Sequence, residues 1–201
     1  MNSADTHALD HHHHHQMEMD STDVFGFWLY IMTDCVLFAS LFAAFIVLHH
    51  PHAYGPKLVI ELPYVLGETF FLLFSNLTFG LAILCMYKNK KSWLSSLLVL
   101  TFILGAGFVF MEVNEFIHLI HTGYSPSVSG AASAFFVLVG THGFHVSMGL
   151  LWIAIMIAQI HRFGITGSVQ RRLTYLGLFW NFLDIVWIFL FTVVYLLGVF
   201  Q

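Results

Sequence analysis

Charged residues are scarce in this chain of 201 residues. They make up 9% of the sequence, against roughly 25% in soluble globular proteins, while hydrophobic residues make up 58%. Only seven residues are Lys or Arg, and the net charge is −4, whereas nucleic-acid binding requires a basic surface. The composition therefore excludes a nucleic-acid partner and indicates that lipid surrounds most of the chain.

Cysteine is also rare. Cys35 and Cys85 both fall in apolar runs, where a free cysteine packs as a small hydrophobic residue. The sequence has no cysteine spacing of the kind that holds zinc, c-type haem or an iron–sulfur cluster. We therefore expect no cysteine-ligated metal or cofactor.

Long apolar runs, by contrast, dominate the sequence. A helix needs about 20 mainly apolar residues to cross a bilayer, and five such runs cover residues 25–48, 63–87, 93–121, 131–160 and 173–199. The short stretches between them carry proline, glycine and charged residues, and loops this short make neighbouring helices antiparallel. The sequence predicts an all-α integral membrane protein, with residues 24–201 forming a bundle of five transmembrane helices.

The basic residues predict the orientation of this bundle. Six of the seven lie in the second and fourth loops, as Lys88, Lys90, Lys91, Arg162, Arg171 and Arg172, and only Lys57 lies elsewhere. Because basic loops tend to stay in the cytoplasm, we expect a cytoplasmic N-terminus and a periplasmic C-terminus.

The first 23 residues are rich in histidine and acidic side chains. Such a segment has too little apolar surface to fold alone, so we expect residues 1–23 to be a disordered cytoplasmic tail. Its run His11–His15 could bind a metal ion, but it also resembles a purification tag. We interpret any metal binding there as adventitious.

Ionisable residues inside the apolar runs are the candidate functional residues, because each costs at least ~2.5–3.5 kcal/mol at the bilayer centre on insertion scales. At ~1.5 Å per residue, groups from different helices fall at matching depths, with Glu68 and Glu115 both roughly 8–9 Å from the periplasmic side. We predict one interior polar network. It comprises Asp34, Glu68, Glu112, Glu115, His142, His145, Asn181 and Asp184. Any single member could equally be a hydrogen-bonded group that only holds two helices together. So large a set, however, favours a role beyond packing.

These residues leave other functions open. The carboxylates could form the proton relay of a small transporter, and a quinol-binding haem anchor subunit is a second alternative. Glu115-x-x-His118 has the step found in di-iron bundles, but such a site needs a second motif and two further glutamates. His142 and His145 share one helix, so they cannot ligate a haem from opposite sides. We therefore expect no metal site in this chain.

Four stretches together resemble subunit III of the haem–copper terminal oxidases. The most specific is residues 140–146 (GTHGFHV), similar to the family's G-x-H-G-x-H-V motif. The others are residues 179–187 (FWNFLDIVW), residues 104–108 (LGAGF) with Glu112-x-x-Glu115, and residues 25–28 (FGFW) with 32–34 (MTD). Asn181 stands where the family normally has histidine, and asparagine hydrogen-bonds without carrying a proton near neutral pH.

The resemblance implies a function and partners. Five helices in 201 residues resemble the quinol oxidase branch, closest to cytochrome bo-type ubiquinol oxidases. Such a complex oxidises ubiquinol, reduces dioxygen to water and pumps protons across the bacterial cytoplasmic (inner) membrane. In this family, haems, copper and the quinol site belong to subunit I. The chain would then carry no cofactor and no catalytic residue of its own, pack with subunits I, II and IV, bind phospholipid, and support assembly and stability.

Overall fold

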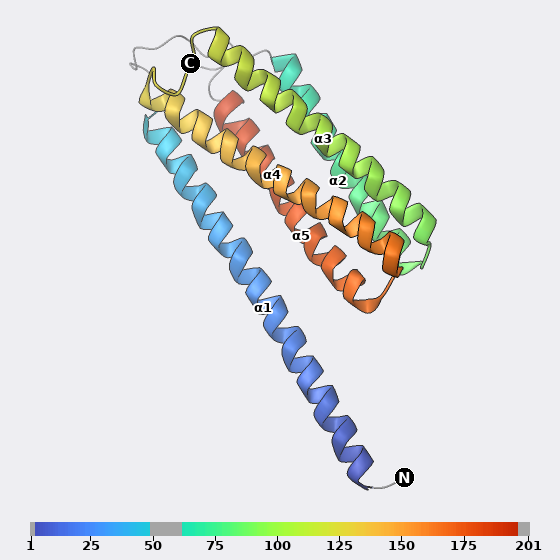
Figure 1. Ribbon diagram of the computed structural model, residues 1–201. Helices are drawn as coiled ribbons and strands as arrows, with labels where there is room; N and C mark the ends of the chain where they lie inside the picture. Colours follow the sequence, from blue (N-terminus) through green and yellow to red (C-terminus); the bar gives the residue numbers. More distant parts are fainter. Residues whose placement is uncertain (1–2, 49–61, 197–201) are drawn as a thin grey trace. The chain divides into compact units, whose positions relative to one another are not determined.

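The structure, a computed structural model, describes residues 3–48 and 62–196. These residues are almost entirely helical (Figure 1). The helices are α1 (Ser3–Leu48), α2 (Leu62–Tyr87), α3 (Lys91–His121), α4 (Gly130–Phe163) and α5 (Gly167–Leu190), and a wider π-helical turn, Phe191–Leu196, follows α5. Five of the helices are long and apolar enough to cross a membrane. The predicted all-α fold, with five helices of this kind, is confirmed.

The chain divides within α1 into two units, Met1–Ala39 and Ser40–Gln201. In the first unit, α1 begins at Ser3, whereas the sequence predicts disorder up to residue 23. No glycine or proline occurs between Ser3 and Val24, so no residue there breaks a helix. The membrane-spanning part of α1 begins at Val24, close to the predicted boundary.

In the second unit, α2 to α5 form a four-helix ring. Helix α2 packs on α3, α3 on α4, α4 on α5, and α5 on α2 (Figure 1). Short turns join them, and Gly164, at the turn between α4 and α5, has a φ of +73°. Glycine adopts this conformation without strain, so the chain reverses directly after Phe163. The helices joined by these turns are therefore antiparallel.

Helix α5 begins at Gly167, not at residue 173 as the apolar run suggests. Residues 168–172 (SVQRR) are mostly polar but contain no helix breaker, so the helix starts before its membrane-spanning part. Arg171 and Arg172 thus lie in the first turns of α5 and not in a loop. The guanidinium of Arg172 donates a hydrogen bond to Oε1 of Gln159 on α4 over 3.3 Å.

The core of the ring is organised around Trp180 of α5, which is 1% exposed. Its ring occupies space that two glycines leave free. A Cβ atom added at Gly105 of α3 or at Gly149 of α4 would lie 3.1 Å or 2.8 Å from it. The indole nitrogen donates a hydrogen bond to Ser75 Oγ of α2 over 3.3 Å. One side chain therefore contacts all three other helices of the ring.

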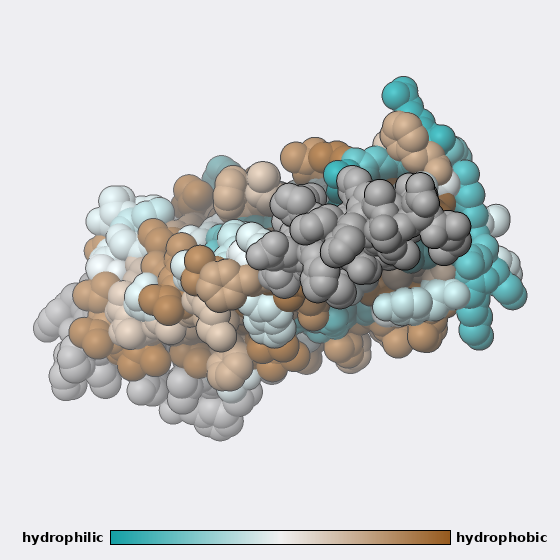
Figure 2. All heavy atoms as spheres, turned by 90° about the horizontal axis from the view of Figure 1, so that it is seen from below, coloured by the Kyte–Doolittle hydropathy of each residue, from teal (hydrophilic) through white to brown (hydrophobic). Residues whose placement is uncertain are grey.

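Large apolar side chains cover the outer surface of the ring. Phe70, Phe110 and Phe144, from three different helices, are all more than half exposed. Figure 2 shows one side of the molecule, where brown, hydrophobic residues cover much of the surface. So much exposed apolar surface is unfavourable in water, and it suits contact with lipid or with other membrane helices.

Candidate functional site: polar residues between the helices

Three buried carboxylates gather between α2 and α3. Glu68 of α2 is fully buried, and Glu112 and Glu115 of α3 are 3% and 9% exposed. The two glutamates of α3 are three residues apart and so lie on one helix face. Both are close enough to Glu68 for their charges to interact with it. We call Glu68, Glu112 and Glu115 the carboxylate cluster.

Several oxygens of this cluster have no hydrogen-bond partner among the described residues. Within the part of the chain that the structure describes, neither oxygen of Glu68 accepts or donates a hydrogen bond, and the same holds for Oε1 of Glu112. Beside the cluster, the hydroxyl of Tyr64 on α2 donates to the carbonyl oxygen of Met111 on α3 over 3.0 Å. That bond joins the two helices next to the carboxylates.

Glu112 reaches α4 at a glycine of the histidine motif. A Cβ atom added at Gly143 would lie 2.6 Å from both carboxylate oxygens of Glu112, much closer than atoms can approach without moving. Gly143 follows His142 and lies two residues before His145. The carboxylate therefore meets α4 between the two histidines, and the absence of a side chain at Gly143 makes room for it.

The two histidines lie in different surroundings. His142 is fully buried, and its ring stacks on Trp187 of α5 at a centroid distance of 5.3 Å and meets the ring of Phe108 of α3 edge-on at 5.9 Å. His145 is half-buried, and its Nδ1 lies 2.8 Å from the carbonyl oxygen of Thr141. His142 belongs to the aromatic core, whereas His145 lies at its edge.

On α5, Asp184 is buried and pairs with a residue that the sequence analysis missed. Its Oδ2 accepts a hydrogen bond from the side-chain amide of Asn76 of α2 over 3.0 Å. Asn76 is the single amide side chain in the apolar run 63–87, and that signal could have revealed it. The bond joins two helices at membrane depth, where such bonds hold a bundle together.

Asn181 differs from its prediction. The sequence places it in the interior network with Asp184, but the structure places it at an exposed position. The buried face of α5 carries Trp180, Asp184 and Trp187, and Asn181 lies at the border of that face. A step of one residue turns the helix by about 100°, which is enough to move a side chain from the interior to the surface.

Hydroxyl and indole groups add further bonds between α2 and its two neighbours. Ser75 Oγ donates to the carbonyl oxygen of Thr101 on α3 over 3.3 Å, and the hydroxyls of Thr78 and Thr101 lie 2.9 Å apart. On the other side, the indole of Trp187 donates to Thr69 Oγ1 over 3.1 Å. These residues are uncharged, so the cost of burying a charge, which singles out the ionisable residues in the sequence, does not reveal them.

Asp34 lies on α1, in the first unit. It is 7% exposed, and the hydroxyl of Tyr30, one helical turn earlier, makes a side-chain hydrogen bond with it. That it joins the carboxylates of the second unit in one network stays a prediction.

The arrangement of these polar residues suits two roles, proton exchange and helix packing. Carboxyl groups and an imidazole can hold protons, and they lie between helices that hydroxyl and amide groups also join. Among residues 3–48 and 62–196, no group of three or more His, Cys, Asp or Glu side chains lies close enough together to hold a metal ion.

Comparison with known proteins identifies the class to which such a helical membrane protein belongs. The family model of cytochrome c oxidase subunit III matches residues 5–199. The chain therefore belongs to the cytochrome c oxidase subunit III family, and the resemblance seen in its motifs is confirmed.

Individual relatives narrow the comparison to quinol oxidases. The chain is 54% identical over 197 residues to cytochrome bo(3) ubiquinol oxidase subunit 3 of Pseudomonas aeruginosa, covering 97% of this chain and 94% of that protein. It is 55% identical over 178 residues to the protein of that name from Pseudomonas putida, covering 88% and 86%. It is 41% identical over 185 residues to quinol oxidase subunit 3 of Bacillus subtilis, covering 91% of each.

Proposed function

We propose that this chain is subunit III of a bacterial ubiquinol oxidase, a complex that oxidises ubiquinol, reduces dioxygen to water and pumps protons. The observation that carries the proposal is the 54% identity to the P. aeruginosa subunit over 97% of the chain. Nearly every residue takes part in this match, so it reflects the whole membrane domain and not a shared motif.

The role of the chain within the complex is support. Haems, copper and ubiquinol are held by subunit I, and this chain packs with subunits I, II and IV in the inner membrane and binds phospholipid. The way the chain uses its polar groups supports this role. The pairs Asn76–Asp184 and Thr69–Trp187 join helices to each other, and the carboxylate cluster is buried between α2 and α3.

Two basic turns support the orientation that we propose. Lys91, at the start of α3, donates to the carbonyl oxygen of His161, near the end of α4, over 3.5 Å, so the two turns lie at the same end of the ring. Lys88, Lys90, Arg162, Arg171 and Arg172 are exposed near the same turns. Basic residues are retained on the cytoplasmic side, which favours a cytoplasmic N-terminus and a periplasmic C-terminus.

A proton transporter built on the carboxylates is the alternative function that the sequence leaves open. The comparisons do not favour it, because the relatives described above are named as subunits of oxidases. The two functions differ in a simple measurement. A transporter would move protons across liposomes as an isolated chain, whereas a supporting subunit would not.

Removal of the chain from the complex tests its supporting role. The initial rate of oxygen consumption with ubiquinol is measured per haem in the complete complex and in a complex assembled without this chain. We expect initial rates within about twofold of each other, a difference below ~0.5 kcal/mol, and faster inactivation during turnover without the chain. A loss of about a hundredfold, or ~2.7 kcal/mol, at normal haem content would mean that the chain takes part in catalysis.

A further inference from the structure

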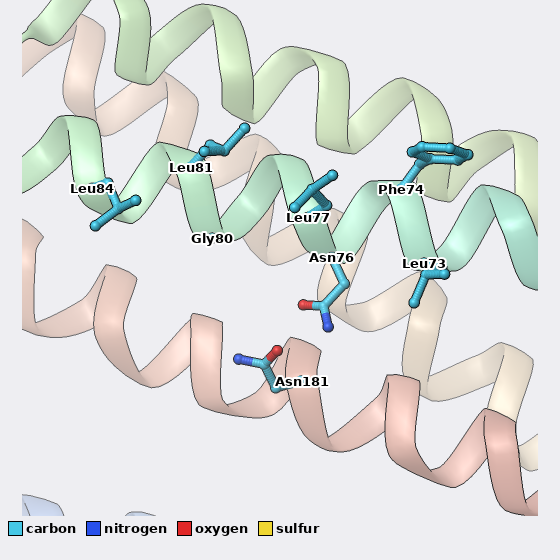
Figure 3. Close-up of a pocket in the computed structure, with 8 residues that line it drawn as sticks. All are labelled: Leu73, Phe74, Asn76, Leu77, Gly80, Leu81, Leu84 and Asn181. Atoms are coloured by element: carbon cyan, nitrogen blue, oxygen red, sulfur yellow. The ribbon is translucent and has the colours of Figure 1, made fainter.

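A groove runs along α2 on its side toward α5. Its volume is about 620 Å³, and its lining includes Leu73, Asn76, Leu77, Gly80 and Leu84 of α2 and Asn181 of α5. Leu73, Leu77, Gly80 and Leu84 recur at steps of four, three and four, so they form one continuous stripe along the helix, and Asn76 lies beside it. Figure 3 shows the side-chain amides of Asn76 and Asn181 pointing toward each other from the two helices.

Asn181 lies in the middle of the membrane-spanning part of α5. That part begins after Arg172, which at ~1.5 Å per residue places Asn181 roughly 12 Å inside a hydrocarbon core ~30 Å thick, close to its centre. The side chain is exposed, and no described residue makes a hydrogen bond with it. An exposed polar group without a hydrogen-bond partner at the centre of a hydrocarbon layer costs several kcal/mol.

Two other exposed polar side chains in the spans avoid this cost within their own helix. The amide of Asn114 donates to the carbonyl oxygen of Phe110 over 3.0 Å. The hydroxyl of Ser147 donates to the carbonyl oxygen of Gly143 over 2.8 Å. Asn181 has no such bond within the described residues, so its amide is available to a group outside this chain.

The depth of Asn181 indicates whether the hydrogen-bond partner of its amide is a lipid or a protein. A lipid acyl chain has no hydrogen-bonding atom, and ester and head groups lie about 15 Å from the centre of a hydrocarbon core ~30 Å thick. A transmembrane helix can place a polar side chain at mid-membrane. The stripe Leu73, Leu77, Gly80 and Leu84 has the alternating spacing of a helix–helix seam. Around Gly80, nothing lies within 4 Å of an added Cβ, which leaves room for a second backbone.

We propose that this groove is the docking site for a transmembrane helix of another subunit, which presents a hydrogen-bonding side chain to Asn181 at mid-membrane. The inference rests on the proposed function in taking that helix from the same oxidase complex. The apolar stripe of α2 supplies the contact area, and the amide of Asn181 fixes the register of the incoming helix.

Photo-crosslinking in the intact complex tests this inference. A benzophenone amino acid replaces Leu77 in the groove, 58% exposed, or Ile103 on α3 as a matched control, 59% exposed. The complex is irradiated in the membrane and purified, and crosslinked peptides are identified by mass spectrometry. We expect Leu77 to give a product with a transmembrane segment of another subunit that contains a polar residue.

Substitutions at Asn181 test whether the partner helix binds specifically in the groove or merely lies near it. Asn181→Leu should lower the yield of the Leu77 product about fivefold, since an interhelical hydrogen bond of ~1 kcal/mol is lost. Asn181→Gln, which keeps the amide, should restore most of it. Neither variant should change the products at Ile103. An unchanged yield in Asn181→Leu would overturn the inference. So would products with lipid alone, with α1 of the same chain or with a second copy of it.

The inference and the proposed function can fail separately. If the Leu77 product forms as expected but the purified complex does not oxidise ubiquinol, the groove is a dock and the assignment to an oxidase is wrong. If the complex consumes oxygen normally but Leu77 labels only lipid, the oxidase assignment stands and the dock is wrong.

Discussion

Gly143 shows how a single residue without a side chain can position a buried carboxylate. The histidines on either side of it mark the motif in the sequence, but the glycine is the residue that Glu112 touches, at 2.6 Å from the position of an added Cβ. The motif could be recognised from the sequence. The reason for its glycine could not, because Glu112 lies on a different helix.

Gly143→Ala should therefore destabilise the ring. The added methyl group would overlap the Glu112 carboxylate, and an overpacked core costs about 1–3 kcal/mol. The midpoint of unfolding in SDS should fall. Gly140→Ala is the matched control one turn earlier, because its Cβ would meet Phe116 at an ordinary 3.7 Å.

A second substitution identifies the cause of this loss. In Glu112→Ala the carboxylate is removed, so adding Gly143→Ala should cost little more. If Gly143→Ala destabilises the Glu112→Ala protein as much as it destabilises the original protein, the two residues are independent, and the proposed contact is wrong.

Asp34 allows a residue-scale test of whether a buried carboxylate is used chemically. Asp34→Asn keeps the shape and hydrogen bonding of the side chain but removes its titratable proton, so we expect the complex to assemble with most of its initial oxidase rate. Asp34→Leu leaves partners unsatisfied at ~1–3 kcal/mol each and should weaken assembly. A loss of activity in Asp34→Asn of about a hundredfold, with normal haem content, would show a direct catalytic role.

At the scale of the helix, the sequence predicts which elements exist better than where they begin or which way they face. Apolar run length revealed all five spans, because crossing a bilayer requires it. The start of α5 was wrong because its first turns are polar, and Asn181 was assigned to the wrong surface because helix contacts, not spacing alone, decide the border of a buried face. Asn76 and Ser75 are uncharged, so the cost of burying a charge does not single them out in the sequence.

Trp180 is the element-scale contact that we expect to matter most for the ring. Trp180→Ala removes a ring buried against α3 and α4 together with the hydrogen bond to Ser75 on α2. Large-to-small changes of this kind cost about 3–5 kcal/mol, so the yield of folded protein and its resistance to SDS should fall sharply. Trp93→Ala, at a position 66% exposed, is the control and should unfold at nearly the original SDS concentration.

At the scale of the whole molecule, composition and basic residues predict a membrane protein and its orientation. The interior arrangement depends on which helices are neighbours. That order, α2–α3–α4–α5, cannot be read from the sequence of any single span. The carboxylate cluster could be anticipated from matching depths of Glu68 and Glu115, whereas the contact with Gly143 required the neighbour order.

Orientation can be measured with reporters fused after Gln201. With a cytoplasmic N-terminus and five spans, alkaline phosphatase fused there should be active, because it folds only in the periplasm, and a fluorescent protein that folds only in the cytoplasm should be dark. The opposite pattern would contradict the predicted orientation or the number of spans that cross the membrane.

Ubiquinol-driven oxygen consumption by the material that purifies with this chain tests its assignment most directly. The chain is isolated from its own membranes in mild detergent, and the rate of oxygen consumption and the haem content are measured on the same sample. We predict that a larger haem-bearing subunit accompanies the chain and that ubiquinol supports oxygen uptake by the complex. A chain that purifies alone, without haem or oxygen uptake, and that moves protons across liposomes would contradict the assignment.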